Sequence, residues 1–68
     1  MARDWRRRGM RLKKLREARG WTQTELAEKV GVARNTITRL EIGSSRPSLA
    51  LLERIAKALR VKVGELLE

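Results

Sequence analysis

The side chains in this sequence that could do chemistry are mainly cations and hydrogen-bond donors, and four of them share one face of a short segment. Ile37 and Leu40 mark the apolar face of a helix predicted over residues 33–41, and the opposite face is polar. That polar face holds Arg34, Asn35, Thr38 and Arg39. Arginine and asparagine form directional, paired hydrogen bonds, so this face suits recognition of a polar surface. Histidine and cysteine are absent and the carboxylates do not cluster on one face, so we expect no enzyme, no cofactor and no metal site.

The charge balance predicts a polyanionic partner. The 68 residues include 17 Lys or Arg and 8 Asp or Glu, which gives a net charge of +9. A chain without cysteine forms no disulfide and suits a reducing compartment. No apolar run approaches the roughly 20 residues of a membrane span, and no signal-peptide core follows the basic start. We therefore expect a soluble cytoplasmic protein with no membrane partner.

The positive charge is concentrated near the N-terminus. Residues 1–20 carry nine basic and two acidic side chains, a net +7, and the rest of the chain carries +2. We divide the chain into a basic N-terminal arm or helix extension at residues 1–8 and one domain at residues 9–68. The arm could contact phosphates or could be a solvated tail. A membrane-surface helix anchored by Trp5 is a weaker interpretation, because few apolar residues accompany the arginines.

The apolar spacing predicts an all-α fold. Helices are expected over residues 9–19, 23–30, 33–41, 48–59 and 64–67. Thr22 and Glu25 fit a capping box at the start of the second helix, and Gly20 and Gly31 suit the left-handed position that follows a helix. Pro47 lies in the one cluster of loop-forming residues, at 43–47, and Ser48 can cap the helix after it.

Residues 23–42 carry a helix-turn-helix pattern. Two helices joined by so tight a turn need a small residue where their backbones approach and a glycine where the chain reverses, and Ala27 and Gly31 meet these needs. The inner faces are apolar at five positions: Leu26, Val30, Val32, Ile37 and Leu40. With these residues, the segment from Gly9 to Leu67 resembles the lambda-repressor and Cro class of XRE-like helix-turn-helix proteins. The resemblance implies a compact five-helix domain.

The resemblance also implies roles in binding double-stranded DNA. The third helix would enter the major groove. Its expected base-contacting residues are Ala33, Arg34, Asn35, Thr38 and Arg39. Arginine can donate two hydrogen bonds to guanine, asparagine can pair with adenine, and the methyl groups of Ala33 and Thr38 can meet those of thymine. The expected phosphate contacts are Gln23, Thr36, Gly43, Ser44, Ser45 and Arg46, of which the glycine and the two serines would act through backbone amides.

Arg16 and Glu41 match a pair that forms a structural ion pair between the first and third helices of the class. Two departures from the class concern helix caps. Ala33 stands where Ser or Thr commonly caps the recognition helix, which loses about 1 kcal/mol. Lys62 and Gly64 replace a usual Ser or Thr cap before the fifth helix. Trp21 is expected to pack on the core.

The function expected from this resemblance is a transcriptional regulator that reads a pseudo-palindromic operator as a homodimer at the nucleoid. The apolar residues near the C-terminus either form the dimer interface or close the core of one copy; they are Val61, Val63, Leu66 and Leu67. The alternatives are an adaptor that binds another protein, like antitoxins or coactivators of this fold, and a nonspecific nucleic-acid binder.

Overall fold

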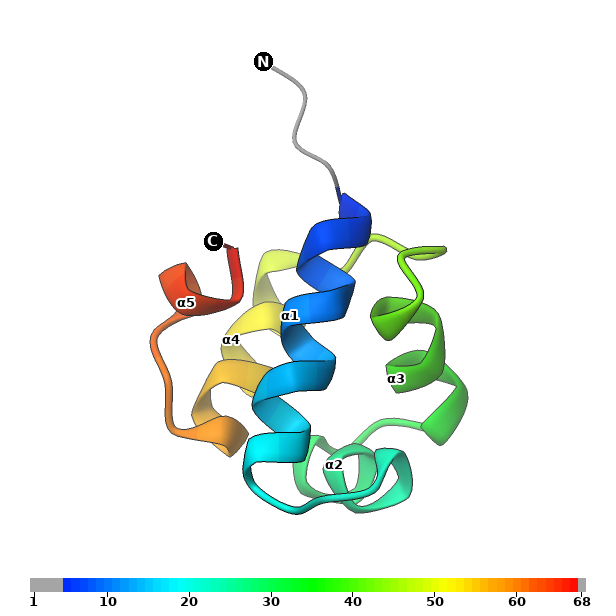
Figure 1. Ribbon diagram of the computed structural model, residues 1–68, viewed down its shortest axis with the longest axis vertical. Coiled ribbons are helices and arrows are strands. Elements are labelled where there is room, and N and C mark those ends of the chain that lie inside the picture. The colour runs from blue at the N-terminus through cyan, green and yellow to red at the C-terminus, as the bar shows by residue number, and fades with distance from the viewer. Residues whose placement is uncertain (1–4, 68) are drawn as a thin grey trace.

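The part of the chain that the structure describes folds into five α-helices and contains no strand. The computed structural model describes the backbone of residues 5–67 and the side chains of residues 11–66. The helices are α1 (Trp5–Ala18), α2 (Gln23–Val30), α3 (Arg34–Glu41), α4 (Leu49–Leu59) and α5 (Val63–Leu67). In Figure 1, α1 runs through the middle of the molecule, with α3 on one side and α5 on the other. The predicted all-α, five-helix architecture is confirmed, and none of the described helices has the length and apolar character needed to cross a membrane.

The apolar spacing predicts that the first helix begins at Gly9. In the structure it begins at Trp5 and ends at Ala18. Arginine is a good helix former, and a single interior glycine costs only about 1 kcal/mol. The additional turn carries no apolar stripe, so periodicity gives no sign of it. Residues 5–8, which lie in the segment predicted as an arm or a helix extension, therefore belong to α1. The rest of the arm, and the side chains of Trp5 and the arginines at 3 and 6–8, lie outside the described residues.

Local capping chemistry sets the ends of the shorter helices. The Thr22 hydroxyl accepts a hydrogen bond from the Glu25 amide at 3.0 Å, and the Glu25 carboxylate accepts one from the Thr22 amide at 2.8 Å. This is the predicted capping box. Gly31 ends α2 with φ +87°, and Ser48 caps α4 through the Leu51 amide. Ala33 forms no side-chain cap for α3, in agreement with its lack of a hydroxyl group.

The capping box should make stability depend on pH through Glu25. The hydrogen bond from the Thr22 backbone lowers the pKa of Glu25 below its ordinary value of 4.5. Because the pKa of Glu25 is depressed in the folded state, the ionised carboxylate stabilises the fold at pH values above its ordinary pKa. This contribution is lost as the pH falls through the pKa of the folded state. We expect Glu25→Gln to unfold at a lower temperature than the wild type near neutral pH, and the difference to shrink as the pH falls below 4.5.

The control for this prediction is Glu28→Gln, which changes the charge of the same helix without touching Thr22. Glu28 is exposed on α2 and takes no part in the capping box. Thermal unfolding followed by circular dichroism across the acid range measures both variants. Identical pH dependence in Glu25→Gln and Glu28→Gln would contradict the role of the cap.

The end of α4 stores backbone strain at Arg60. Its φ is +58°, and it is the one residue other than glycine with positive φ among those described. The left-handed conformation costs an L residue roughly 1–2 kcal/mol, which glycine avoids at some cost in chain entropy. We expect Arg60→Gly to stabilise the fold by roughly 0.5–1 kcal/mol, or about 2–8 °C in Tm for a domain of this size. Lys62→Gly, at a residue without positive φ, should leave Tm unchanged or lower it, so equal effects of the two changes would refute the strain argument.

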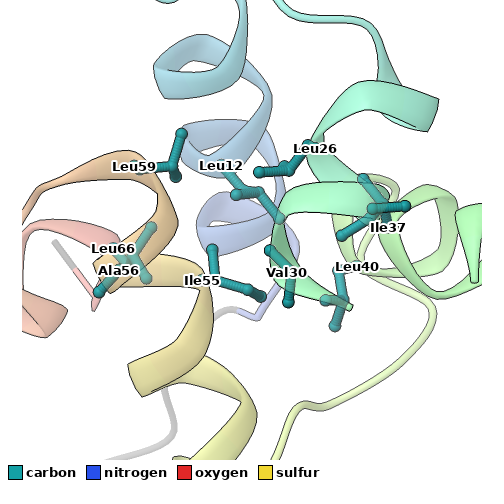
Figure 2. Close-up of a cluster of buried hydrophobic side chains, with 10 residues drawn as sticks. Leu12, Leu26, Val30, Ile37, Leu40, Ile55, Ala56, Leu59 and Leu66 are labelled. Carbon is teal, nitrogen blue, oxygen red and sulfur yellow. The ribbon is translucent and has the colours of Figure 1, made fainter. Parts of the chain in front are cut away.

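The core lies where the five helices meet around α1. Leu26, Ile37, Leu40, Ile55 and Leu59 are the largest fully buried side chains. Figure 2 shows Leu12 among them, between the side chains of α2 and those of α4. Ala27 is 3% exposed, as expected for the small residue of the turn. Val32 and Trp21 are half-buried and pack against this core, which confirms the inner faces predicted for the helix-turn-helix.

The C-terminal apolar residues serve the core of a single copy. Leu66 is 3% exposed and belongs to the core, and Val61 and Val63 pack against it. The Arg11 side chain donates a hydrogen bond from α1 to the Glu65 carbonyl of α5. The side chain of Leu67 lies outside the described residues. Of the two roles expected for these residues, the structure uses Leu66, Val61 and Val63 for packing within the monomer.

Candidate nucleic-acid interface

The outward face of α3 presents its polar side chains on a rigidly packed helix. Ile37 is 0% exposed and Leu40 is 1% exposed, so these two residues fix the rotation of α3 about its axis. Arg34, Asn35 and Arg39 are exposed as a result, and Thr36 and Thr38 are half-buried at the edges of the face. The Arg34 and Arg39 guanidinium groups have no hydrogen-bond partner among the side chains that the structure describes. Their donors are free to meet a ligand.

The first turn of α2 adjoins this face of α3. The Thr38 hydroxyl of α3 donates a hydrogen bond to Gln23 Oε1 of α2 at 2.9 Å. This bond joins the two helices at the interface. Gln23 opens α2, where backbone N–H groups lack partners within the helix and favour an anion. The capping box uses the N–H of Glu25, and the Leu26 N–H bonds to the Thr22 carbonyl. The N–H groups of Gln23 and Thr24 remain at the open end of the helix.

A buried ion pair holds α3 against α1. Arg16 Nε donates to Glu41 Oε2 at 2.5 Å, and Arg16 Nη2 donates to Glu41 Oε1 at 3.0 Å. Arg16 is 7% exposed and Glu41 is 5% exposed. Arg16 Nη1 also donates to the Trp21 carbonyl, which ties the start of the helix-turn-helix to the same pair. The hydrogen bond to Glu41 raises the pKa of Arg16, so the guanidinium stays charged at every working pH.

The loop after α3 closes the end of that helix with its own backbone. The Gly43 amide donates to the Leu40 carbonyl at 3.3 Å, and the Ser44 amide donates to the Arg39 carbonyl at 3.0 Å. With Gly43 at φ +78°, this is a Schellman motif. The two amides are therefore engaged in the helix end, although both residues were expected to offer their N–H groups to phosphate. Ser45 is half-buried and Arg46 is exposed in the same loop.

The structure thus brings most of the predicted site residues to one region, and it adds links that the sequence does not reveal. Residues 33–36, Thr38 and Arg39 lie on or beside the outward face of α3, and Gln23 contacts that face through Thr38. Gln23 Nε2 also donates to Glu41 Oε1 at 2.9 Å. Eighteen residues separate these two side chains. No periodicity or capping rule connects them, so sequence patterns offer no signal for this bond.

One arginine of α4 contributes to the frame around the interface. Arg54 Nη2 on α4 donates to the Val30 carbonyl at 2.8 Å and lies close to the Gly31 carbonyl at 3.3 Å. A side chain at Gly31 would meet Arg54 Nη2 at 2.8 Å. The turn between α2 and α3 therefore needs glycine for its positive φ, and a side chain there would also displace the Arg54 guanidinium. The sequence patterns gave no sign of this role of Arg54 in holding the turn.

Comparisons with known proteins agree with this geometry. Residues 12–66 match the sequence profile of a helix-turn-helix family. An HTH-type transcriptional regulator of Archaeoglobus fulgidus, described as uncharacterized, is 45% identical over 56 residues, which cover 82% of this chain and 80% of that protein. The HTH-type transcriptional regulator SinR of Bacillus subtilis is 38% identical over 61 residues, which cover 88% of this chain and 55% of SinR. The chain thus spans about half the length of SinR.

Solved structures place the fold in the same group. The restriction-modification controller protein C.AhdI of Aeromonas hydrophila superposes with a TM-score of 0.90 and 35% identity, over 93% of this chain and 91% of that one. SinR, solved in complex with DNA, superposes with a TM-score of 0.86 and 37% identity, over 90% and 98%. The family profile matches about four-fifths of the chain, so the predicted class is confirmed. This chain belongs to the helix-turn-helix family of the Cro/C1/XRE type, a family of DNA-binding transcriptional regulators.

Proposed function

We propose that this protein reads specific sequences in double-stranded DNA with the outward face of α3 and regulates transcription by occupying an operator. The observation that carries the proposal is the exposed, unpaired set of donors on a helix that Ile37 and Leu40 lock in place: Arg34, Asn35 and Arg39. Side chains held on a rigid element can be presented to base edges in one register. The solved complex of SinR with DNA supports the proposal by similarity.

We assign the roles within the interface by similarity to the class, adjusted by which backbone amides of the loop after α3 are already engaged. Base contacts fall to Ala33, Arg34, Asn35, Thr38 and Arg39. Phosphate contacts fall to the first turn of α2 with Gln23, to Thr36, and to the loop at Ser45 and Arg46. The amides of Gly43 and Ser44 support this loop and donate within it. Phosphate contacts set the position of the protein on the duplex, and base contacts set its sequence preference.

A homodimer on a pseudo-palindromic site forms the second part of the proposal. An eight-residue recognition helix contacts few base pairs, and two copies about 34 Å apart would place two such helices in successive turns of the major groove. Because Leu66 is buried in the monomer core, the dimer interface lies outside it. A protein with this function works where the chromosome is, so we propose a cytoplasmic, nucleoid-associated location.

Selection from a random pool of duplex DNA tests the proposal. Binding is carried out at about 0.15 M salt, where nonspecific attraction to phosphates is weakened. We expect a two-fold symmetric consensus that Lys62→Ala retains, since the loop of Lys62 lies on the side of the molecule away from α3 (Figure 1). Steeply salt-dependent binding without any consensus would contradict the proposal and favour a nonspecific binder. Capture of a stoichiometric protein partner that survives high salt and nuclease, without DNA binding, would favour an adaptor.

A further inference from the structure

A chain of three hydrogen bonds runs from the buried ion pair to the outward face of α3. Glu41 Oε1 accepts from Arg16 Nη2 at 3.0 Å and from Gln23 Nε2 at 2.9 Å. Gln23 Oε1 in turn accepts from the Thr38 hydroxyl at 2.9 Å. Glu41 and Arg16 are buried, whereas Gln23 and Thr38 are half-buried and reach the solvent-exposed side. The chain therefore connects a charge in the core to a side chain that faces the DNA groove in the proposed complex.

The charge of Glu41 fixes which group donates in each of these three hydrogen bonds. An ionised carboxylate only accepts hydrogen bonds, so the amide nitrogen of Gln23 must face Glu41. The amide oxygen of Gln23 then faces Thr38, and an amide oxygen is also only an acceptor. The Thr38 hydroxyl must supply the proton of that bond. The orientation of a glutamine amide is often ambiguous, but here the neighbouring charge determines it.

The single proton of Thr38 is consequently held within the protein. The other acceptor near the hydroxyl is the Arg34 carbonyl, one turn earlier in α3 at 3.2 Å. Both acceptors belong to the protein, and the bond to Gln23 is the shorter, so the proton is held within the protein while Gln23 is present. A threonine hydroxyl retains acceptor capacity after it donates. Towards the groove, Thr38 therefore offers lone-pair density and its methyl group.

We infer that Thr38 reads an exocyclic amino group in the major groove as a hydrogen-bond acceptor, and that Gln23 is the positioning residue that imposes this role. The inference rests on the function proposed above. The amino groups exposed there are N6 of adenine and N4 of cytosine, while guanine presents the acceptors N7 and O6. Guanine is rejected at this place because its acceptors would face an oxygen with no proton to give. An A·T pair suits Thr38 fully, since the thymine methyl can meet the threonine methyl.

The test uses the operator selected by the wild-type protein and two near-isosteric variants. Thr38→Val keeps the shape and removes the oxygen, and Gln23→Met keeps the length and removes the amide. The base pair that Thr38 reads is identified as the operator position at which the base preference of the protein changes in Thr38→Val. At an A·T pair there, purine in place of adenine removes N6 and 7-deazaadenine removes N7. If the pair is C·G, the probe is instead a cytosine analogue that lacks the 4-amino group.

We expect loss of the amino group to weaken wild-type binding about two- to tenfold, as for one hydrogen bond, and to leave Thr38→Val binding unchanged. Loss of N7 should leave both unchanged. In Gln23→Met the hydroxyl keeps only its longer bond, to the Arg34 carbonyl at 3.2 Å, and a guanine acceptor can compete for that proton. The ratio of affinities for the amino-bearing base over guanine should therefore fall about two- to tenfold. The same substitution in a Thr38→Val background should leave that ratio unchanged. Thr36→Val controls for loss of a neighbouring hydroxyl, and thermal unfolding of each variant verifies the fold.

Three outcomes would overturn the inference. The first is that Thr38→Val changes no base preference, and the second is that binding at the identified pair depends on N7 and not on the amino group. The third is that Gln23→Met lowers affinity for all sequences equally, which would make Gln23 a phosphate contact only. These outcomes leave a wild-type consensus in place and so leave the proposed function intact. Absence of any wild-type consensus would overturn both proposals together.

Discussion

Replacement of Arg16 by alanine should lower Tm by more than about 10 °C, because it leaves the Glu41 carboxylate buried without its cation. Glu41 is 5% exposed, and Arg16 donates two hydrogen bonds to it. Removal of one partner from a buried pair typically costs about 3–5 kcal/mol, more than the pair itself contributes. The Trp21 carbonyl also loses its donor. Thermal unfolding monitored by circular dichroism measures the effect.

Two further variants separate the buried charge from other causes of this loss. Lys13→Ala, at an exposed position of α1, should change Tm little. The double substitution Arg16→Met with Glu41→Leu removes both charges and should recover part of the stability lost in Arg16→Ala. DNA affinity should fall in Arg16→Ala only as far as the folded fraction falls. A Tm equal to that of the wild type would refute the structural role of the pair.

Substitution of Arg39 by alanine should reduce affinity for the selected operator about 10- to 100-fold, since a bidentate contact to a base is worth about 1–3 kcal/mol. Arg39 is exposed on α3, and its guanidinium has no partner within the described side chains. The substitution should therefore leave Tm nearly unchanged. Preference at one position of the operator should relax, and affinity for random duplex DNA should fall much less. Arg34→Ala should behave in the same way at a different position.

Arg46→Ala provides the matched comparison for Arg39→Ala. Both are exposed arginines, but Arg46 lies in the loop after α3 and is assigned to phosphate. Its loss should weaken binding to all sequences alike and reduce the slope of log affinity against log salt by about 1. Fluorescence anisotropy titrations at several salt concentrations measure both variants. Uniform loss in Arg39→Ala, with the operator preference unchanged, would contradict base reading by that residue.

Local chemistry made much of the fold predictable from the sequence. The Thr22–Glu25 capping box, the Gly31 turn and the Ser48 cap act over three or four residues, so they are visible in the chain itself. The apolar spacing likewise identified the buried faces of α2 and α3 and left the polar face of α3 outward. It missed the first turn of α1 because arginines at residues 6–8 continue a helix without giving it an apolar stripe.

The positions of the helices, their apolar faces and the polar face of α3 follow from the residues alone, because these properties depend on neighbours within about one turn. How polar groups from different helices share their protons depends on the packing of those helices. The bonds from Glu41 to Gln23 and from Gln23 to Thr38 join residues 18 and 15 positions apart. Such bonds exist only once packing has brought α2 and α3 to a fixed distance, since a hydrogen bond fails beyond a few tenths of an ångström of misplacement.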